Sequence, residues 1–401
     1  VALSTDDLPQ LIARAYAVFD SERPRPVHIS VPLDVLSAPV ARDWSNDVVR
    51  RPGRGTPAAT ALDEAVARLH GAKRPMIIAG GGALNAAQEL AELSTRLAAP
   101  LFTSVAGKGL LPPDAPLNAG SSLCVEPGWN LIAEADVVLA VGTEMADTDF
   151  WRERLPINAE LLRVDIDPRK FNDFYPCAVA LHGDAQQTLA AVLERLSPDV
   201  RDAGAAIGKV AALREAIQAG HGPLQSIHQA ILQRIAAELP ANAFISTDMT
   251  QLAYTGNYAF ASEATRSWLH PTGYGTLGYG LPAGIGAKFG APQRPGLVLV
   301  GDGGFLYTAQ ELATAVEELD SPLVVLLWNN DALGQIRDDM IGLDIEPIGV
   351  LPRNPDFAAL GRAFGCTVTQ PQNLAELQTD LRHGFNRNGV TLIELKHACV
   401  R

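Results

Sequence analysis

The stretch GLVLVGDGGFLYTAQELATAVEELDSPLVVLLWNND, residues 296–331, decides the fold of this 401-residue chain. It contains an apolar strand that runs into glycines, a helical segment over 308–319, and a second apolar strand. A strand, a helix and another buried strand joined by short connections are typical of a parallel sheet. Ligands of such sheets bind beyond the carboxyl ends of the strands. Two polar clusters, GDGG at 301–304 and NND at 329–331, lie at two such ends.

The same alternation of strands and helices runs through most of the chain. We expect strands over residues 75–83, 99–105, 136–143, 160–167, 242–248 and 391–395, the last one closing its sheet. We expect helices over residues 85–98, 186–196 and 226–239, and a helix at 7–20 followed by a strand at 26–35. Linkers are expected at 41–57, which is rich in Arg, Pro and Gly, and near 197–222.

These elements predict an α/β fold class with two doubly wound, mainly parallel sheet domains. Residues 41–200 form a central Rossmann-like domain, and residues 201–401 form a second sheet domain that carries the two polar clusters. The helix and strand within residues 1–40 are too little to fold alone. They are read as the tail of a third α/β domain.

Composition narrows the class of protein. The net charge of −13 argues against a nucleic-acid partner, and no apolar run is long enough to span a bilayer. Four cysteines lie far apart in the sequence and form no C-x-x-C pair, which favours reduced thiols and a cytoplasmic location. The chain begins at Val1 with no visible signal peptide.

The GDGG cluster indicates a diphosphate site that contains a metal ion. Glycines let backbone N–H groups approach a phosphate, and the helix that follows adds its positive end. Asp302 would repel a phosphate unless a cation lay between them, and Mg²⁺ prefers oxygen ligands. The amide oxygen of Asn330 and the backbone carbonyl of Ala332 supply further candidate ligands. GDG or NN alone is more often an ordinary turn, and the pair after consecutive strands is more specific.

GDGGF…WNND resembles the diphosphate-binding signature of thiamine-diphosphate enzymes. The segment GYGTLGYGLPAGIGA, residues 273–287, and the strand-end motif STDMTQ, residues 246–251, are similar to those of the acetolactate synthase, benzoylformate decarboxylase and pyruvate decarboxylase group. The resemblance covers essentially the whole chain. It implies decarboxylation of a 2-oxo acid, with possible carboligation, and thiamine diphosphate and Mg²⁺ as cofactors.

The resemblance assigns roles residue by residue. The implied Mg²⁺ ligands are Asp302, Asn330 and the carbonyl of Ala332. The implied diphosphate-binding residues are Gly303, Gly304, Gln251 and Thr250. Leu277 matches the bulky residue that bends the cofactor, and the carbonyl of Gly275 matches the acceptor for the aminopyrimidine. Without the family, core packing would explain Leu277 equally well.

The resemblance also implies partners. Residues 1–40 resemble the end of a pyrimidine-binding domain, and the glutamate that activates the cofactor lies near the start of that domain, outside this sequence. Two subunits share each site in the family, so a homodimer or homotetramer is implied. A catalytically silent, nucleotide-binding regulatory subunit is an alternative. An NAD-dependent dehydrogenase would need a G-x-G-x-x-G fingerprint with an acidic residue about 20 residues further on, and the glycine turn of the central block, GGGALN at residues 80–85, does not match it.

The substrate wall departs from acetolactate synthases. Residues 333–340 are polar and charged instead of hydrophobic, and Leu252 replaces the family's histidine. Asp338 and Asp339 could face a cationic substrate end, and Arg337 could hold a carboxylate, although a solvated helix face would explain the three charges as well. The segment is similar to 5-guanidino-2-oxopentanoate decarboxylases. The candidate substrate-pocket residues are His270, Gln335, Arg337, Asp338 and Asp339.

The sequence of the central domain leaves open whether this domain binds a nucleotide. Gly80, Gly81 and Gly82 follow an expected strand, and the family holds FAD in this domain in some members. Three glycines without the full fingerprint are weak evidence. FAD is possible here but is not favoured.

Overall fold

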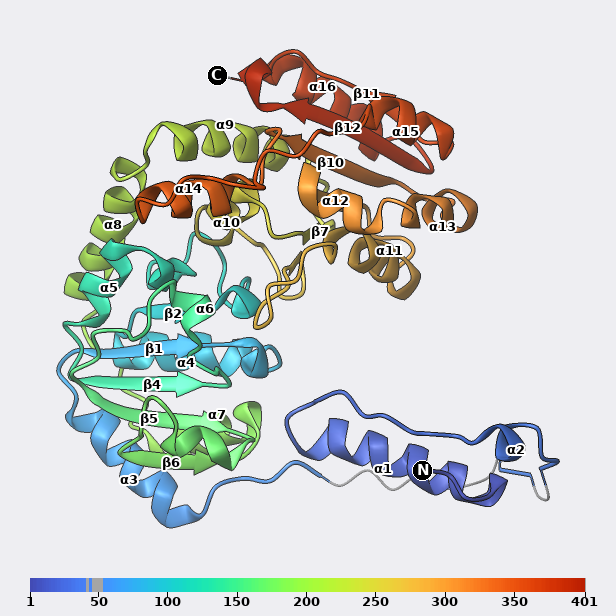
Figure 1. Ribbon diagram of the computed structural model, residues 1–401. Coiled ribbons are helices and arrows are strands. Elements are labelled where there is room, and N and C mark those ends of the chain that lie inside the picture. The colour runs from blue at the N-terminus through green and yellow to red at the C-terminus, as the bar shows by residue number, and fades with distance from the viewer. Residues whose placement is uncertain (41–42, 45–52, 401) are drawn as a thin grey trace.

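The computed structural model describes residues 1–40, 43–44 and 53–400. Two six-stranded sheets, each with all strands parallel, form the centres of two layered units (Figure 1). The predicted fold class of two doubly wound parallel-sheet domains is confirmed. Among the described residues, no helix is long and apolar enough to cross a membrane.

The central sheet has the strand order β3-β2-β1-β4-β5-β6. Its strands are β1 (Pro75–Ala79), β2 (Leu101–Thr103), β3 (Asn118–Gly120), β4 (Val137–Val141), β5 (Glu160–Asp165) and β6 (Val179–His182). The helices around it are α3 (Ala59–Gly71), α4 (Ala87–Leu97), α5 (Glu126–Ile132), α6 (Asp147–Phe150), α7 (Ala185–Arg195) and α8 (Gly204–Ala219). Helices α3, α4 and α7 pack on one face, and α5, α6 and α8 on the other. Because both faces are covered, β1 and β4 are buried at every position and carry unbroken apolar runs.

The C-terminal sheet has the strand order β11-β12-β10-β9-β7-β8. Its strands are β7 (Phe244–Thr247), β8 (Trp268–Leu269), β9 (Gly296–Gly301), β10 (Leu323–Asn329), β11 (Thr367–Thr369) and β12 (Val390–Lys396). Its helices are α9 (Pro223–Glu238), α10 (Gln251–Ala259), α11 (Gly280–Gly290), α12 (Asp302–Thr308), α13 (Glu311–Glu318), α14 (Gly334–Gly342), α15 (Phe357–Ala363) and α16 (Leu374–Phe385). Helices α9, α10 and α16 cover one face, and α11, α12, α13 and α15 cover the other.

Three sequence-based expectations are wrong. The segment at 26–35 forms no strand but an irregular stretch followed by the short helix α2 (Leu33–Leu36), since among the described residues no strand pairs with it. The linker near 197–222 contains α8, whose alanine-rich sequence has little amphipathic periodicity. The strand at 391–395 does not close its sheet, because β12 lies between β10 and β11. The expected linker at 41–57 lies largely outside the described residues.

The N-terminal helix α1 (Leu8–Ser21) forms as expected, but only Ala15 of it is buried. Leu213 of α8 packs in a core of the central sheet, and Arg201 donates to carbonyls at the end of α3. The domain boundaries at 40/41 and 200/201 stay predictions. From the packing of α8 we propose that the second boundary lies nearer to residue 220. Helices α8 and α9 run along one side and connect the two sheets (Figure 1).

The two units meet at a buried lysine. Lys108, which follows β2, donates to the carbonyl oxygens of Gly256 (3.2 Å), Asn257 (2.8 Å) and Phe260 (2.7 Å) at the end of α10. Its positive charge lies where the helix dipole is negative. The next residue, Gly109, has φ +82°, and a Cβ there would lie 2.1 Å from the carbonyl oxygen of Ala264. Backbone therefore touches backbone between the units at this point.

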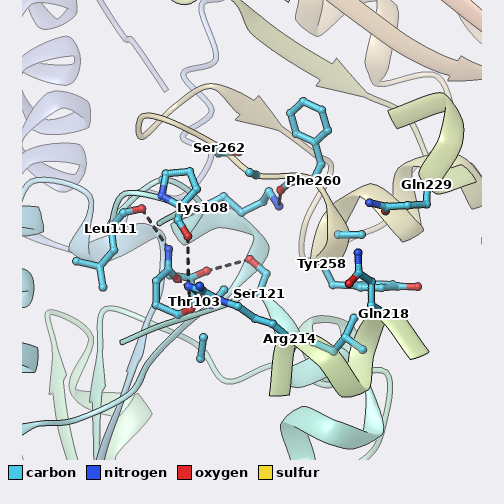
Figure 2. A pocket seen from close by; sticks show the side chains of 18 of the residues that line it. Thr103, Lys108, Leu111, Ser121, Arg214, Gln218, Gln229, Tyr258, Phe260 and Ser262 are labelled. Atoms are coloured by element: carbon cyan, nitrogen blue, oxygen red, sulfur yellow. Dashed lines mark hydrogen bonds between the residues drawn. The ribbon is translucent and has the colours of Figure 1, made fainter. Parts of the chain in front are cut away.

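A cavity of about 340 Å³ lies beside this contact (Figure 2). Arg214 extends from α8 across it toward Thr103 and Ser121, whose hydroxyl oxygens lie 2.9 Å apart. One guanidinium nitrogen of Arg214, Nη2, donates to three backbone carbonyls, those of Pro113, Ala115 and Asn118. The cavity is thus bounded by two cations that cap carbonyl groups: Lys108 joins the two units, and Arg214 fastens α8 to the central unit.

His228 on α9 gives the fold a predictable pH dependence. Burial, reinforced by repulsion from His397, lowers the pKa of His228 to about 4. The folded state keeps the ring neutral, while the unfolded chain takes up a proton below the ordinary pKa of about 6.5. Stability from this group is therefore complete above pH 6.5 and falls as the pH drops toward 4. Relative to His228→Gln, the wild type is expected to lose ~2 kcal/mol over this range. Urea unfolding at several pH values measures it, and parallel curves for the two proteins would contradict it.

Candidate active site

The two polar clusters meet at one edge of the C-terminal sheet. Strand β9 ends at Gly301 and its parallel neighbour β10 ends at Asn329, with Trp328 and Gly301 in register. The residues that follow, Asp302 and Asn330, therefore leave the sheet side by side. Both line one cavity of about 190 Å³. Helix α12 begins at Asp302 itself, earlier than the expected helix at 308, so the glycines lie in its first turn.

Most of the sequence-predicted site residues are brought together here. The cavity lining includes Thr250, Gln251, Gly275, Leu277, Asp302, Gly303, Gly304, Asn330, Ala332 and Gln335. Four predicted residues do not line it, namely His270, Arg337, Asp338 and Asp339. His270 lines a smaller adjacent cavity, and the other three lie along α14 beyond the rim.

Asp302 is buried and held by an asparagine that the sequence did not reveal. Its Oδ2 accepts a hydrogen bond from Nδ2 of Asn354 (2.7 Å), and its Oδ1 accepts one from the backbone N–H of Gly303 (2.9 Å). Burial raises the pKa of the Asp302 carboxyl, because the charged form is desolvated. Asn354 also donates to Oδ1 of Asn329 and of Asp331, and its own Oδ1 is buried with no partner in the described part of the chain. The asparagine thus links the two loop ends.

Asp248, at the end of β7, is a second residue that sequence reasoning missed. Its two carboxylate oxygens accept from the backbone N–H groups of Met249 (2.9 Å), Gly278 (3.1 Å) and Gly280 (2.7 Å). Burial raises its pKa, and these hydrogen bonds act in the opposite direction. The carboxylate fixes the glycine-rich segment over the cavity. Asp248 lies within the strand-end motif STDMTQ, and this position at the end of a strand was the only sequence feature that could have indicated its role.

Glycines leave the cavity its space. A Cβ on Gly304 would lie 2.5 Å from Oδ1 of Asp248, and one on Gly334 would lie 2.5 Å from Oε1 of Gln251. A Cβ on Gly303 would lie 2.6 Å from the side chain of Leu333. Backbone N–H groups at a helix start, free of side chains, are the arrangement that binds phosphate. The residues therefore fit a diphosphate with a cation beside Asp302.

Gly304→Ala is expected to weaken the site without unfolding the protein. Its methyl group would displace the Asp248 carboxylate and with it the glycine-rich segment. We expect the apparent Kd for thiamine diphosphate, measured by calorimetry with Mg²⁺, to rise about tenfold. Gly286→Ala, on α11 with nothing within 4 Å of the added Cβ, is the matched control. Equal affinities in both variants would contradict the prediction.

The charged residues of α14 are already paired. Asp338 accepts from Nε2 of Gln251 (2.8 Å) through one oxygen and from the guanidinium of Arg337 (2.8 and 3.0 Å) through the other. Asp339 accepts from the amide of Gln335 (2.8 Å). Gln251 in turn accepts a hydrogen bond at its Oε1 from Nδ2 of Asn330 (3.4 Å). This chain of contacts connects α14 to the polar cluster after β10.

His270 is held at both ring nitrogens. Its Nδ1 lies 2.6 Å from Oγ1 of Thr247, and its Nε2 lies 3.1 Å from Nδ2 of Asn257. An amide N–H₂ is only a donor, so Nε2 accepts and Nδ1 carries the proton. Burial, with repulsion from Lys108, lowers the pKa of His270 to about 4. The ring is thus a neutral packing element with no free nitrogen for the cavity.

The glycines of the central sheet line a cavity of about 480 Å³ at the ends of β1, β4 and β5. A Cβ on Gly82 would lie 2.9 Å from Gly142, so these turns pack backbone on backbone. The lining carries five carboxylates and three arginines. The lining therefore has an excess of negative charge. A flavin dinucleotide would bring two further negative charges, so its binding in this cavity is not favoured. The carboxylates are Glu22, Glu144, Asp149, Asp165 and Asp184, and the arginines are Arg23, Arg54 and Arg266.

Comparison with known proteins agrees with this geometry. Residues 62–192 match the family model "Thiamine pyrophosphate enzyme, central domain", and residues 248–395 match "Thiamine pyrophosphate enzyme, C-terminal TPP binding domain". The chain belongs to the thiamine pyrophosphate enzyme family. The first matched segment contains all six strands of the central sheet, and the second contains most of the C-terminal sheet and the whole lining of the 190 Å³ cavity. The predicted family and the predicted use of thiamine diphosphate are confirmed.

Curated relatives span the chain. The probable 2-ketoarginine decarboxylase of Pseudomonas aeruginosa is 79% identical over 401 residues, covering 100% of this chain and 72% of that protein. The acetolactate synthase isozyme 1 large subunit of Escherichia coli is 29% identical, covering 98% of this chain and 70% of that protein. A probable acetolactate synthase large subunit of Methanocaldococcus jannaschii is 27% identical, with 97% and 69% covered. The predicted enzyme class, thiamine-diphosphate-dependent decarboxylation of 2-oxo acids, is confirmed by these matches.

Proposed function

We propose that this thiamine pyrophosphate enzyme decarboxylates a 2-oxo acid with a cationic far end, of which 5-guanidino-2-oxopentanoate (2-ketoarginine) is the model. The observation that carries the proposal is the 79% identity to the Pseudomonas aeruginosa protein over 401 residues, a match that covers the whole chain. Acetolactate formation is the second candidate, supported by the lower identities of 29% and 27%.

We propose Mg²⁺ as the second cofactor, bound by the Asp302 carboxylate, the Asn330 amide oxygen and the Ala332 carbonyl. Hard oxygen donors of this kind suit Mg²⁺, which also takes ligands from phosphates. No group of three His, Cys, Asp or Glu able to hold a metal occurs among the described residues. The proposed ligand set contains one carboxylate. This is expected for a metal ion whose positive charge is also balanced by a bound diphosphate.

The roles of the other residues follow from their places in the cavity. Gly303 and Gly304 would give backbone N–H groups to the diphosphate, with Gln251 and Thr250 beside them. Leu277 and the carbonyl of Gly275 would orient the rings of the cofactor. When bound, thiamine diphosphate supplies the electron sink for the carbanion that loss of CO₂ leaves. The side chains of this chain position the substrate and exclude water.

The proposal includes further partners. A pyrimidine-binding domain would supply the activating glutamate, and a homodimer or homotetramer would complete each site. Tyr274 in the glycine-rich segment is 94% exposed and Tyr307 on α12 is 64% exposed, so these side chains are available to such an interface. The four cysteines are free, which supports the cytoplasmic location expected from the sequence.

The proposed substrate is tested with the full-length enzyme, thiamine diphosphate and Mg²⁺. CO₂ release is measured from pyruvate, an aromatic 2-oxo acid and 5-guanidino-2-oxopentanoate. We expect the guanidino acid to have the highest kcat/KM, with the corresponding aldehyde as product. Preference for pyruvate with a C–C coupled product would instead establish the acetolactate synthase reading.

A further inference from the structure

A second, smaller cavity adjoins the one assigned to the cofactor. Its volume is about 50 Å³, and Met249, Tyr254 and Gly275 line both cavities. The opposite wall of the small cavity comes from the central unit, through Asp149 and Trp151 at the end of α6. A molecule whose reacting end lies beside Gly275 can therefore extend toward α6.

Asp149 presents an uncompensated carboxylate to this cavity. Its side chain forms no hydrogen bond or ion pair with any of the described residues, and it lies in the wall shared with the central-sheet cavity. Burial, together with repulsion from Glu144 and Asp147, raises the pKa of Asp149 to about 6. Glu144 has cationic partners, Arg23 (2.9 Å) and Lys170 (3.6 Å), which Asp149 lacks. Asp149 is half-buried, and a partly desolvated carboxylate without a partner is costly, so a cation brought by a ligand would offset that cost.

Aromatic rings border the same space. The ring centroid of Trp151 lies 5.9 Å from that of Tyr254 and 6.4 Å from that of Tyr258, both in edge-to-face contact. Trp151 has φ +50°, a left-handed conformation that a bulky residue adopts at a cost of about 1–2 kcal/mol. Strain of this kind is retained where the surrounding structure needs the side chain in one place. Here it turns the indole toward the tyrosines of α10.

We propose that Asp149, with the rings of Trp151 and Tyr254, forms the subsite that receives the guanidinium group of the substrate. A planar guanidinium can donate two parallel hydrogen bonds to a carboxylate while it stacks on an aromatic face. Asp338 and Asp339, the carboxylates that the sequence suggested for this role, already have partners in Arg337, Gln251 and Gln335. This inference rests on the proposed function and names the residue that sets its specificity.

The test uses the full-length holoenzyme and the variant Asp149→Asn, which keeps size and removes charge. We expect kcat/KM for 5-guanidino-2-oxopentanoate to fall about 100-fold, the loss of a charged hydrogen-bonded pair. For 2-oxooctanoate, a 2-oxo acid of similar length whose far end carries no charge, kcat/KM should stay within about twofold. Calorimetry with butylguanidine, a fragment of the cationic end alone, should give weaker binding to Asp149→Asn by a similar factor.

Asp147→Asn is the matched control, because Asp147 is an exposed carboxylate on the same short helix and lines neither cavity. If Asp147→Asn lowers kcat/KM for the guanidino acid by the same factor, the effect comes from the negative potential of the region as a whole. That result would overturn the proposed subsite. A loss in Asp338→Asn with none in Asp149→Asn would also overturn it, while leaving the proposed function standing. If the wild type does not turn over the guanidino acid, the proposed function fails, and butylguanidine binding still decides the role of Asp149.

Discussion

Asp302→Ala is expected to lower kcat/KM for decarboxylation by at least about 1,000-fold and to abolish Mg²⁺-dependent binding of thiamine diphosphate. The alanine removes the only carboxylate that lines the 190 Å³ cavity among the residues that the structure describes. Without it, a divalent cation would have only neutral oxygens from the protein to bind it beside a diphosphate. Calorimetry with and without Mg²⁺ measures the loss of affinity, and CO₂ release measures the loss of activity.

The control for this variant is Asp331→Asn. Asp331 is exposed, lies outside the cavity lining and has φ +54°, a conformation that asparagine tolerates. It accepts from Asn354 at 3.1 Å, so it tests whether the charge near Asp302 matters in general. We expect at most about a tenfold loss there. Tight cofactor binding by Asp302→Ala, whether or not Mg²⁺ is present, would refute the magnesium site.

Lys108→Met is expected to destabilise the protein by about 3 kcal/mol. The methionine keeps the apolar stem but leaves three carbonyls at the end of α10 without their donor. Two of the three lie within 2.8 Å of the ammonium nitrogen, and Lys108 is only 7% exposed, so water replaces the donor poorly. Because the protein has two sheet units, the midpoint of thermal unfolding and its heating-rate dependence should both be measured.

Lys209→Met is the matched control on α8. Lys209 pairs with Glu134 at the surface and is 39% exposed, so we expect a change below about 1 kcal/mol. Without Lys108, α10 loses the cation that caps its C-terminal end. This loss would also loosen Gln251, which lies at the other end of the same helix. The Lys108 variant should therefore bind thiamine diphosphate more weakly, by about threefold to tenfold, while Lys209→Met should not. Equal melting temperatures for the two variants would contradict the interpretation of Lys108 as a buried link.

Much of the candidate site was predictable because it lies at strand ends. Asp302 and Asn330 each follow a buried apolar run, and parallel strands bring such positions to one edge. Asn354 was not predictable, since it reaches Asp302 from an irregular segment 52 residues further along the chain. Asp149 was also missed because the contact is long-range. It belongs to the central unit and lines the small cavity only because the two sheet units pack together.

The fold shows the same division. Long, strongly patterned strands such as β9, β10 and β12 were predictable, whereas β11 has three residues, all half-buried, and gave no signal. Pairing order is a long-range property, so the place of β12 inside its sheet was not available from its sequence. Helix α8 was missed because alanine favours helix on every face and leaves no clear apolar stripe.

The contact between Gly109 and Ala264 has a mechanical consequence. Two backbones that touch, next to an ammonium group shared by three carbonyls, leave the sheets no freedom to rotate about each other at that point. Admission of a substrate must then depend on parts that are not fastened there. The apolar side chains after α14 lie outside that contact and are well exposed, with Leu343 at 72% and Ile348 at 82%, whereas the two sheets form a fixed frame.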